Sequence, residues 1–267
     1  MIRSRFTRDL VYGKDDRLRQ VIHVLEPRSR EEPRPAVVLF HGGGLTAGTP
    51  LQDMDWAEPL ARQGYVAFMA GYRLFDEDSG MNPWPTQLAD ARRAMRWIRA
   101  HARDFNVDPS RLCAMGHSSG GHLAGLLGST DILDETDSEL AGLSSRADCV
   151  VAISGDADFM VPFEDSATTS LLVALFGGTV EEIPAIWRDA SPAHHVDEHT
   201  VPFLIIHGNR DEGVPVQMAR NLASALARAG VEHVYAELSA GHMDIGEREL
   251  AHALWDAFLA DQLRPDP

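Results

Sequence analysis

The chain has 267 residues, of which 44% are apolar and 7% aromatic, and these values are typical of a globular protein. No apolar stretch approaches the length of a membrane-spanning helix, which argues against a helical membrane protein. The formal net charge of −16 repels polyanions, so we expect neither nucleic acid nor an acidic membrane surface as a partner.

The N-terminal region predicts an antiparallel hairpin. Residues 6–12 and 18–25 alternate apolar and polar side chains on either side of Gly13-Lys-Asp-Asp16. A charged, proline-rich linker follows. No apolar segment with a small-residue cleavage site comes after the basic N-terminus, so we expect a cytoplasmic location, although a trimmed mature form would look the same.

From residue 36 onward, short apolar runs alternate with segments of helical periodicity. The predicted strands are residues 36–40, 65–70, 111–115, 149–154, 203–207 and 233–238, and the clearest helices are residues 87–105, 119–127, 216–229 and 247–263. Buried parallel strands joined by crossover helices give an α/β fold, which we expect to form one domain over residues 1–267.

Three local features qualify this pattern. Five arginines between residues 92 and 103 are expected to form a solvated helix face, and Cys113 and Cys149 are expected to pack as free core side chains. Residues 155–200 carry apolar side chains without a clear central strand. We expect this segment to be an insertion over the carboxyl edge of the sheet and a partial lid.

The most informative motif is Gly116-His117-Ser118-Ser119-Gly120, which lies between a predicted strand and a predicted helix. In a G-x-S-x-G turn in that position, the middle residue is strained and its hydroxyl is exposed at the sheet edge. We therefore expect Ser118 to be a nucleophile.

A serine hydroxyl needs a base and an orienting carboxylate to react at neutral pH. Among twelve histidines, His242 stands out because it follows the last predicted strand and so reaches the same sheet edge as Ser118. The loop after residues 203–207 offers Asp211 as the favoured acid and Glu212 as the reserve. The order Ser118, Asp211, His242 is that of the α/β-hydrolases.

Donors for an oxyanion are expected in His41-Gly42-Gly43-Gly44, directly after the strand at residues 36–40. Consecutive glycines allow backbone N–H groups to turn toward a ligand without obstruction by a Cβ. The N–H groups of Gly43, Gly44 and Ser119 are therefore predicted to form the oxyanion hole.

Further motifs extend this pattern along the chain: Gly71-Tyr-Arg73, Pro83-Trp-Pro-Thr-Gln87, Asp108-Pro-Ser-Arg111, Gly116-His-Ser-Ser-Gly-Gly-His122, Ala190-Ser-Pro192, His207-Gly-Asn-Arg-Asp211 and Gly241-His242. With them, the chain from the hairpin onward resembles the α/β-hydrolase fold, specifically HGGG-type esterases and lipases. Within that group it is similar to small bacterial carboxylesterases, including those that remove acetyl or feruloyl groups from plant polysaccharide.

The resemblance implies a mostly parallel central sheet with an N-terminal antiparallel hairpin and helices on both faces. It also implies that Ser118 is the nucleophile, Asp211 the acid and His242 the base, and that Trp84 lines the substrate pocket. Core packing is an equally good account of Trp84. The chain departs from many relatives in its short segment before His41 and in Leu45, where they carry a bulky aromatic.

The expected activity is hydrolysis of short-chain or aryl carboxylic esters through an acyl-enzyme, with a small-molecule ester as substrate and no cofactor or metal. Asp156-Ala-Asp158 and the pair His194-His195 match no strong ligand spacing, and we expect them to be surface charge. A formamidase of the kynurenine-formamidase type on the same triad and a non-catalytic ligand-binding homologue remain alternatives. The oligomeric state stays open, and a homo-oligomer is compatible with the sequence.

Overall fold

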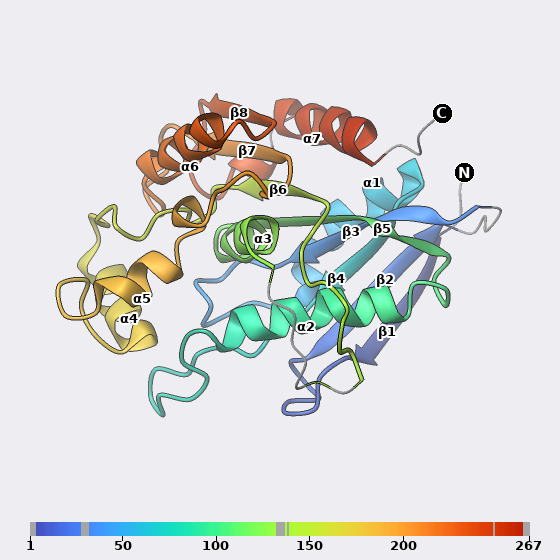
Figure 1. Ribbon diagram of the computed structural model, residues 1–267, viewed down its shortest axis with the longest axis horizontal. Helices are drawn as coiled ribbons and strands as arrows, with labels where there is room; N and C mark the ends of the chain where they lie inside the picture. Colours follow the sequence, from blue (N-terminus) through green and yellow to red (C-terminus); the bar gives the residue numbers. More distant parts are fainter. Residues whose placement is uncertain (1–3, 28–31, 132–136, 138, 248, 264–267) are drawn as a thin grey trace.

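The computed structural model describes residues 4–27, 32–131, 137, 139–247 and 249–263, and is built around an eight-stranded sheet of order β1-β2-β4-β3-β5-β6-β7-β8 (Figure 1). The strands are β1 Ser4–Val11, β2 Val21–Pro27, β3 Arg34–Phe40, β4 Val66–Ala70, β5 Val107–His117, β6 Cys149–Ile153, β7 Phe203–Gly208 and β8 His233–Leu238. β2 pairs antiparallel with β1 and β4, whereas the pairs from β4–β3 to β7–β8 are parallel. The mostly parallel sheet with an antiparallel start is thus confirmed.

The hairpin differs from its prediction at the second strand. β2 begins at Val21, three residues later than expected, because the residues before it form a turn held by side chains. Asp16 Oδ1 accepts hydrogen bonds from the N–H groups of Leu18 and Arg19, at 2.9 and 3.1 Å. Gln20 Oε1 accepts two more from the backbone on the other side of the turn. These side chains compete with strand pairing for the same backbone groups.

Helices cover both faces of the sheet, as expected (Figure 1). They are α1 Met54–Gln63, α2 Thr86–Ala100, α3 Ser119–Ser129, α4 Ser166–Phe176, α5 Pro184–Asp189, α6 Val216–Ala229 and α7 Glu249–Gln262, with short 3₁₀ turns at Pro50–Asp53, Pro192–His194 and Ile245–Glu247. Alternate residues of β3 show the two layers. Val38 and Phe40 join the core under α2, α3 and α6, and Val37 and Leu39 join the core under α1 and α7. None of the helices among the described residues is long and apolar enough to cross a bilayer.

The arginines of α2 do not form the expected solvated face. Arg96 is only 4% exposed. The guanidinium of Arg92 donates to Thr130 Oγ1 at 2.9 Å, and that of Arg99 donates to Asp148 Oδ2 at 3.2 Å. Arg93 donates to the backbone carbonyl of Tyr12 at 2.8 Å. The fifth arginine, Arg103, lies beyond α2 and is exposed as expected. For the other four the prediction was wrong because their side chains are buried or bind neighbouring segments, which a helical periodicity alone does not reveal.

Two regions contain helices that the sequence analysis did not name. α1 has Pro59 inside it, and this residue weakens a sequence-based helix prediction. Residues 155–200 contain α4, α5 and the turn at Pro192–His194, and no strand, consistent with an insertion between β6 and β7. Aromatic side chains tie this segment to the core: between ring centroids, Phe159 lies 5.0 Å from His122 of α3 and Phe176 lies 6.0 Å from Trp84. Its function as a lid stays a prediction.

Candidate active site

Ser118 occupies a strained turn between β5 and α3. Its φ of 55° and ψ of −128° are a backbone conformation that residues with a side chain rarely adopt. The flanking glycines are required by close packing: a Cβ on Gly116 would lie 2.3 Å from the carbonyl carbon of Gly120, and one on Gly120 would lie 1.8 Å from the oxygen of Phe40. The turn therefore places the Ser118 side chain at the end of the strand while the glycines pack against β3.

The loops after β7 and β8 bring an acid to a base. His242 Nδ1 lies 2.8 Å from Asp211 Oδ2, and the Asp211 side chain is fully buried. The other oxygen, Oδ1, accepts hydrogen bonds from the N–H groups of Gly213 and Val214, at 2.9 and 2.8 Å. Glu212, the reserve candidate, is exposed. Of the two acids left open by the sequence, the structure brings Asp211 to His242.

The charges of this pair reinforce each other. Burial by itself would raise the pKa of Asp211, but hydrogen bonds from His207, His242 and the Val214 N–H hold that pKa well below its ordinary value. Burial would lower the pKa of His242, yet the hydrogen bond and negative charge of Asp211 raise it overall. Because the carboxylate accepts a hydrogen bond from Nδ1–H, the neutral imidazole carries its proton on Nδ1 and has a lone pair on Nε2.

Two histidines that sequence reasoning passed over, the buried His207 and the half-buried His117, hold these loops. His207 Nε2 lies 3.0 Å from the carbonyl oxygen of Val214 and 3.3 Å from Asp211 Oδ2. His117 Nε2 donates to the carbonyl of His242 at 2.8 Å, and burial, as the largest cause, lowers the pKa of His117 to about 4. The available signal was position, because one lies beside the serine and the other four residues before the acid.

Ser118 and His242 line the same cavity, which has a volume of about 170 Å³. Its walls come from the glycine loop, the serine turn, the loops after β6, β7 and β8, and α4. The lining residues are Gly44, Leu45, Ser118, Ser119, Asp156, Phe159, Phe163, Thr168, Leu171, Leu172, Gly213, Val214 and His242. The insertion at residues 155–200 therefore supplies much of the wall, including the two leucines of α4.

The glycine loop has the conformation that the sequence required of it. Gly43 and Gly44 have φ of 128° and 61°, and a Cβ on Gly43 would lie 2.3 Å from the carbonyl oxygen of Ala47. The Tyr72 hydroxyl fixes the base of the loop by donating to the carbonyl of His41 at 2.7 Å. The N–H of Ser119 lies in the first turn of α3, where no intrahelical acceptor is available. Donation by Gly43, Gly44 and Ser119 to an oxyanion stays a prediction.

Trp84 lies in the core rather than on the cavity wall. It is 9% exposed, its ring centroid lies 5.2 Å from that of His122 and 6.0 Å from that of Phe176, and it is absent from the cavity lining given above. Contact between Trp84 and substrate stays a prediction. The geometry favours the core-packing account that the sequence left open.

Of the four side chains weighed as metal ligands, Asp158, His194 and His195 bind within the protein, whereas Asp156 lines the cavity. Asp158 is buried, and its carboxylate accepts hydrogen bonds from Asn221 Nδ2 at 2.7 Å and the N–H of Met160 at 3.1 Å, with His194 Nε2 at 3.1 Å. Asp158 is therefore not the surface charge that was expected. Across the part of the chain that the structure describes, no group of three or more His, Cys, Asp or Glu side chains is placed to hold a metal ion.

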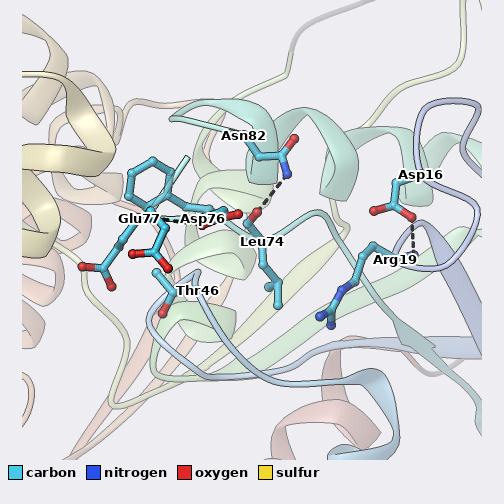
Figure 2. A pocket seen from close by; sticks show the side chains of 9 residues that line it. Asp16, Arg19, Thr46, Leu74, Asp76, Glu77 and Asn82 are labelled. Atoms are coloured by element: carbon cyan, nitrogen blue, oxygen red, sulfur yellow. Dashed lines mark hydrogen bonds between the residues drawn. The ribbon is translucent and has the colours of Figure 1, made fainter. Parts of the chain in front are cut away.

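A larger, acidic hollow lies on the other side of the glycine loop. It has a volume of about 640 Å³ and is lined by Asp16, Arg19, Thr46, Leu74, Phe75, Asp76, Glu77, Asp78 and Asn82. Figure 2 shows that Asp16 and Asn82 bind neighbouring backbone, Asp16 at the N–H of Arg19 and Asn82 at the carbonyl of Leu74. This lining includes no serine, cysteine or histidine, whereas Ser118 and His242 both line the smaller cavity.

Comparison with known proteins agrees with this geometry. The BD-FAE family model matches residues 22–226. Esterase LipC of Mycobacterium tuberculosis is 32% identical over 247 residues, covering 88% of this chain and 59% of LipC. The chain thus spans less than two thirds of the length of this curated relative.

Solved structures show the same fold. A truncated carbohydrate esterase from gut microbiota superposes with a TM-score of 0.84 at 24% identity, covering 98% of this chain and 97% of its own. A thermophilic esterase, Est2 from the Planctomycetes species Thermogutta terrifontis, bound to butyrate, gives a TM-score of 0.78 at 27% identity, covering 99% and 96%. The same esterase phosphonylated by sarin gives 0.79 at 28%, covering 98% and 97%. The predicted α/β-hydrolase fold is confirmed.

Proposed function

The chain belongs to the BD-FAE family, and from that membership and the site geometry we propose that it is a serine carboxylesterase that hydrolyses short-chain or aryl carboxylic esters. One observation carries the proposal. Ser118 and His242 line one cavity, and His242 is bonded through its Nδ1 to a buried carboxylate at 2.8 Å. This is the arrangement by which an alcohol becomes a nucleophile at neutral pH.

The first half of the proposed reaction is attack on the ester. His242 Nε2 takes the proton of the Ser118 hydroxyl as its oxygen bonds to the ester carbonyl carbon. The negative charge that develops on the carbonyl oxygen is stabilised by the backbone N–H groups of Gly43, Gly44 and Ser119. His242 then protonates the alcohol as its bond to carbon breaks, and an acyl-enzyme remains.

The second half returns the serine. A water molecule gives its proton to His242 and bonds to the acyl carbon, after which His242 protonates the departing Ser118 oxygen and the carboxylic acid is released. Throughout, the depressed pKa of Asp211 keeps its carboxylate ionised next to the imidazolium. Its further hydrogen bonds from Gly213 and Val214 hold the carboxylate in place.

The volume of the cavity supports a substrate with a short acyl group. At about 170 Å³ it is smaller than the roughly 300–1,000 Å³ of pockets for drug-sized ligands, and it holds about the volume of six water molecules. Three leucines, two phenylalanines and a valine give its wall an apolar side. These dimensions favour acetyl to butyryl chains. The butyrate bound to the Thermogutta esterase and the sarin adduct of that protein support the same substrate class and the same kind of nucleophile here.

The location and the alternatives remain proposals. We propose a cytoplasmic location, and the buried Cys113 and Cys149 are compatible with it because neither forms a disulfide. The formamidase alternative uses the same groups and is separated by assay. A purely ligand-binding role is disfavoured by the pairing of His242 with Asp211, which binding alone does not require.

The test compares the parent protein with Ser118→Ala. We expect the parent to hydrolyse p-nitrophenyl acetate and to incorporate a fluorophosphonate at Ser118, and we expect the variant to lose both while keeping its circular-dichroism spectrum. A variant rate within tenfold of the parent would show that another group is the nucleophile. Faster turnover of N-formylkynurenine than of the acetate would replace the esterase by the formamidase.

A further inference from the structure

One carboxylate in the cavity has no part in the proposed reaction. Asp156 follows β6, and it lines the cavity together with Ser118 and His242. Its neighbour Gly155 fixes its place, because a Cβ there would lie 2.9 Å from the carbonyl carbon of Gly121 in α3. The loop is therefore pressed against the first turns of the helix that begins at the nucleophile.

The surroundings of Asp156 are otherwise apolar. Besides the glycines, Ser118 and His242, the cavity is lined by Leu45, Phe159, Phe163, Leu171, Leu172 and Val214, with Ser119 and Thr168 as the uncharged polar side chains. A negative charge is screened poorly in such a setting, so its effect on a second charge in the cavity is larger than in water.

Titratable groups on three other elements lie within electrostatic range of Asp156. The imidazoles of His242 and His207 favour its ionised form, whereas the carboxylate of Asp211 disfavours it. Tyr72 lies within electrostatic range as well, and burial raises the pKa of that phenol, so it stays neutral. Burial is the largest influence on Asp156 itself and raises its pKa to about 6. The side chain is therefore mostly ionised at pH 7.5.

We infer that Asp156 is a specificity-determining residue that makes the site prefer esters with a cationic group close to the ester bond and reject esters with a carboxylate there. The inference rests on the proposed esterase function, because it concerns the substrate of the same cavity. The cavity is small enough that an acyl or alcohol substituent next to the ester bond lies near this carboxylate. The preference is local and is separate from the net charge of the chain.

The experiment uses two substrate series, each of which compares a neutral, an anionic and a cationic ester. In the alcohol series, phenyl acetate is compared with 4-acetoxybenzoate and 4-acetoxy-N,N,N-trimethylanilinium. In the acyl series, p-nitrophenyl butyrate is compared with the mono-p-nitrophenyl ester of succinate and that of 4-(trimethylammonio)butyrate. Intrinsic reactivity cancels when the cation-to-anion ratio of kcat/KM in Asp156→Asn is divided by that of the parent.

We expect the cation-to-anion ratio of kcat/KM in Asp156→Asn to be lower than in the parent by about tenfold or more in at least one series. The variant should still hydrolyse the neutral ester. The series that changes shows on which side of the ester bond Asp156 acts. In the parent, the preference should also fade as the pH falls through about 6, whereas in the variant it should not change with pH. Protonation of His242 slows every substrate alike and so cancels from the ratio.

The matched control is Asp165→Asn, which removes the same charge from the N-terminus of α4, outside the cavity. It should leave both ratios unchanged. An unchanged ratio in both series for Asp156→Asn, or an equal change in the control, would overturn the inference and leave the esterase proposal standing. Failure of the parent to turn over any neutral ester would instead count against the proposed function. Asp156→Ser replaces the asparagine variant if that protein does not fold.

Discussion

Replacing Asp211 by asparagine tests whether the buried carboxylate sets the state of the base. The side chain has four neighbours, and the two backbone donors at Gly213 and Val214 keep an oxygen at the Oδ1 position. The new amide NH₂ group must then point toward His242 Nδ1 and His207 Nε2, where Oδ2 now accepts. A donor would face a donor.

The expected loss follows from this geometry. His242 can accommodate the amide by moving its proton from Nδ1 to Nε2, but the ring then has no lone pair to receive the proton of Ser118. The imidazolium formed during attack also loses a charge that lies 2.8 Å away. We expect kcat to fall by about 10³–10⁴-fold, equivalent to roughly 4–5.5 kcal/mol of transition-state stabilisation.

The assay is the initial rate with p-nitrophenyl acetate at saturating substrate, beside the control Glu212→Gln, whose parent side chain is exposed. The control should keep its rate within about twofold, because an exposed charge is well screened. The assignment of the acid would be refuted if kcat fell by less than tenfold in Asp211→Asn, or if it fell further in Glu212→Gln than in Asp211→Asn. Thermal unfolding of both variants separates a loss of structure from a loss of chemistry.

Three further predictions follow from the same contacts. Because the raised pKa of His242 lies above 6.5 and the neutral imidazole is the active form, kcat/KM should rise with pH through that value and at pH 5.5 should be at least about tenfold below its plateau. His117→Ala removes the donor to the carbonyl of His242 and should lower kcat/KM by about fivefold to tenfold, with partial recovery in His117→Gln; equal losses in both would contradict a positioning role. Gly120→Ala places a Cβ 1.8 Å from the Phe40 oxygen and should cost more than about 3 kcal/mol in chemical denaturation, against little for Gly178→Ala, whose nearest neighbours are flexible side chains.

The parallel sheet and the residues at its edge could be predicted because both depend on local pattern. The central strands are continuous apolar runs, and Ser118, Asp211 and His242 each come shortly after a predicted strand. Since parallel strands end at one edge, their successors meet there whatever the details of packing. The choice of Asp211 over Glu212 needed the loop conformation, since two adjacent carboxylates differ only in where each points.

The remaining features depend on contacts between distant segments. Nothing in the periodicity of residues 87–105 shows that Arg99 binds Asp148, and nothing in the sequence around His117 shows that it binds the carbonyl of His242. The cavity wall is of the same kind, because α4 reaches Ser118 only through the fold of its segment. Side-chain partners far apart in sequence follow from tertiary packing, which no local pattern encodes.

The loop that carries His242 is the last part of the site along the chain, and it precedes α7, whose Trp255 packs 5.4 Å from Trp56 of α1 between ring centroids. During synthesis on the ribosome, β5 and α3 therefore emerge while the Ser118 hydroxyl still lacks its base. In the proposed mechanism, Ser118 becomes a nucleophile only when the segment that carries His242 has folded against them. A chain divided between α6 and β8 would separate Ser118 from His242, so we expect neither fragment to hydrolyse an ester. If the fragments associate, hydrolysis of a chromogenic ester would report the association, so the loop between α6 and β8 is a suitable place to divide a split reporter.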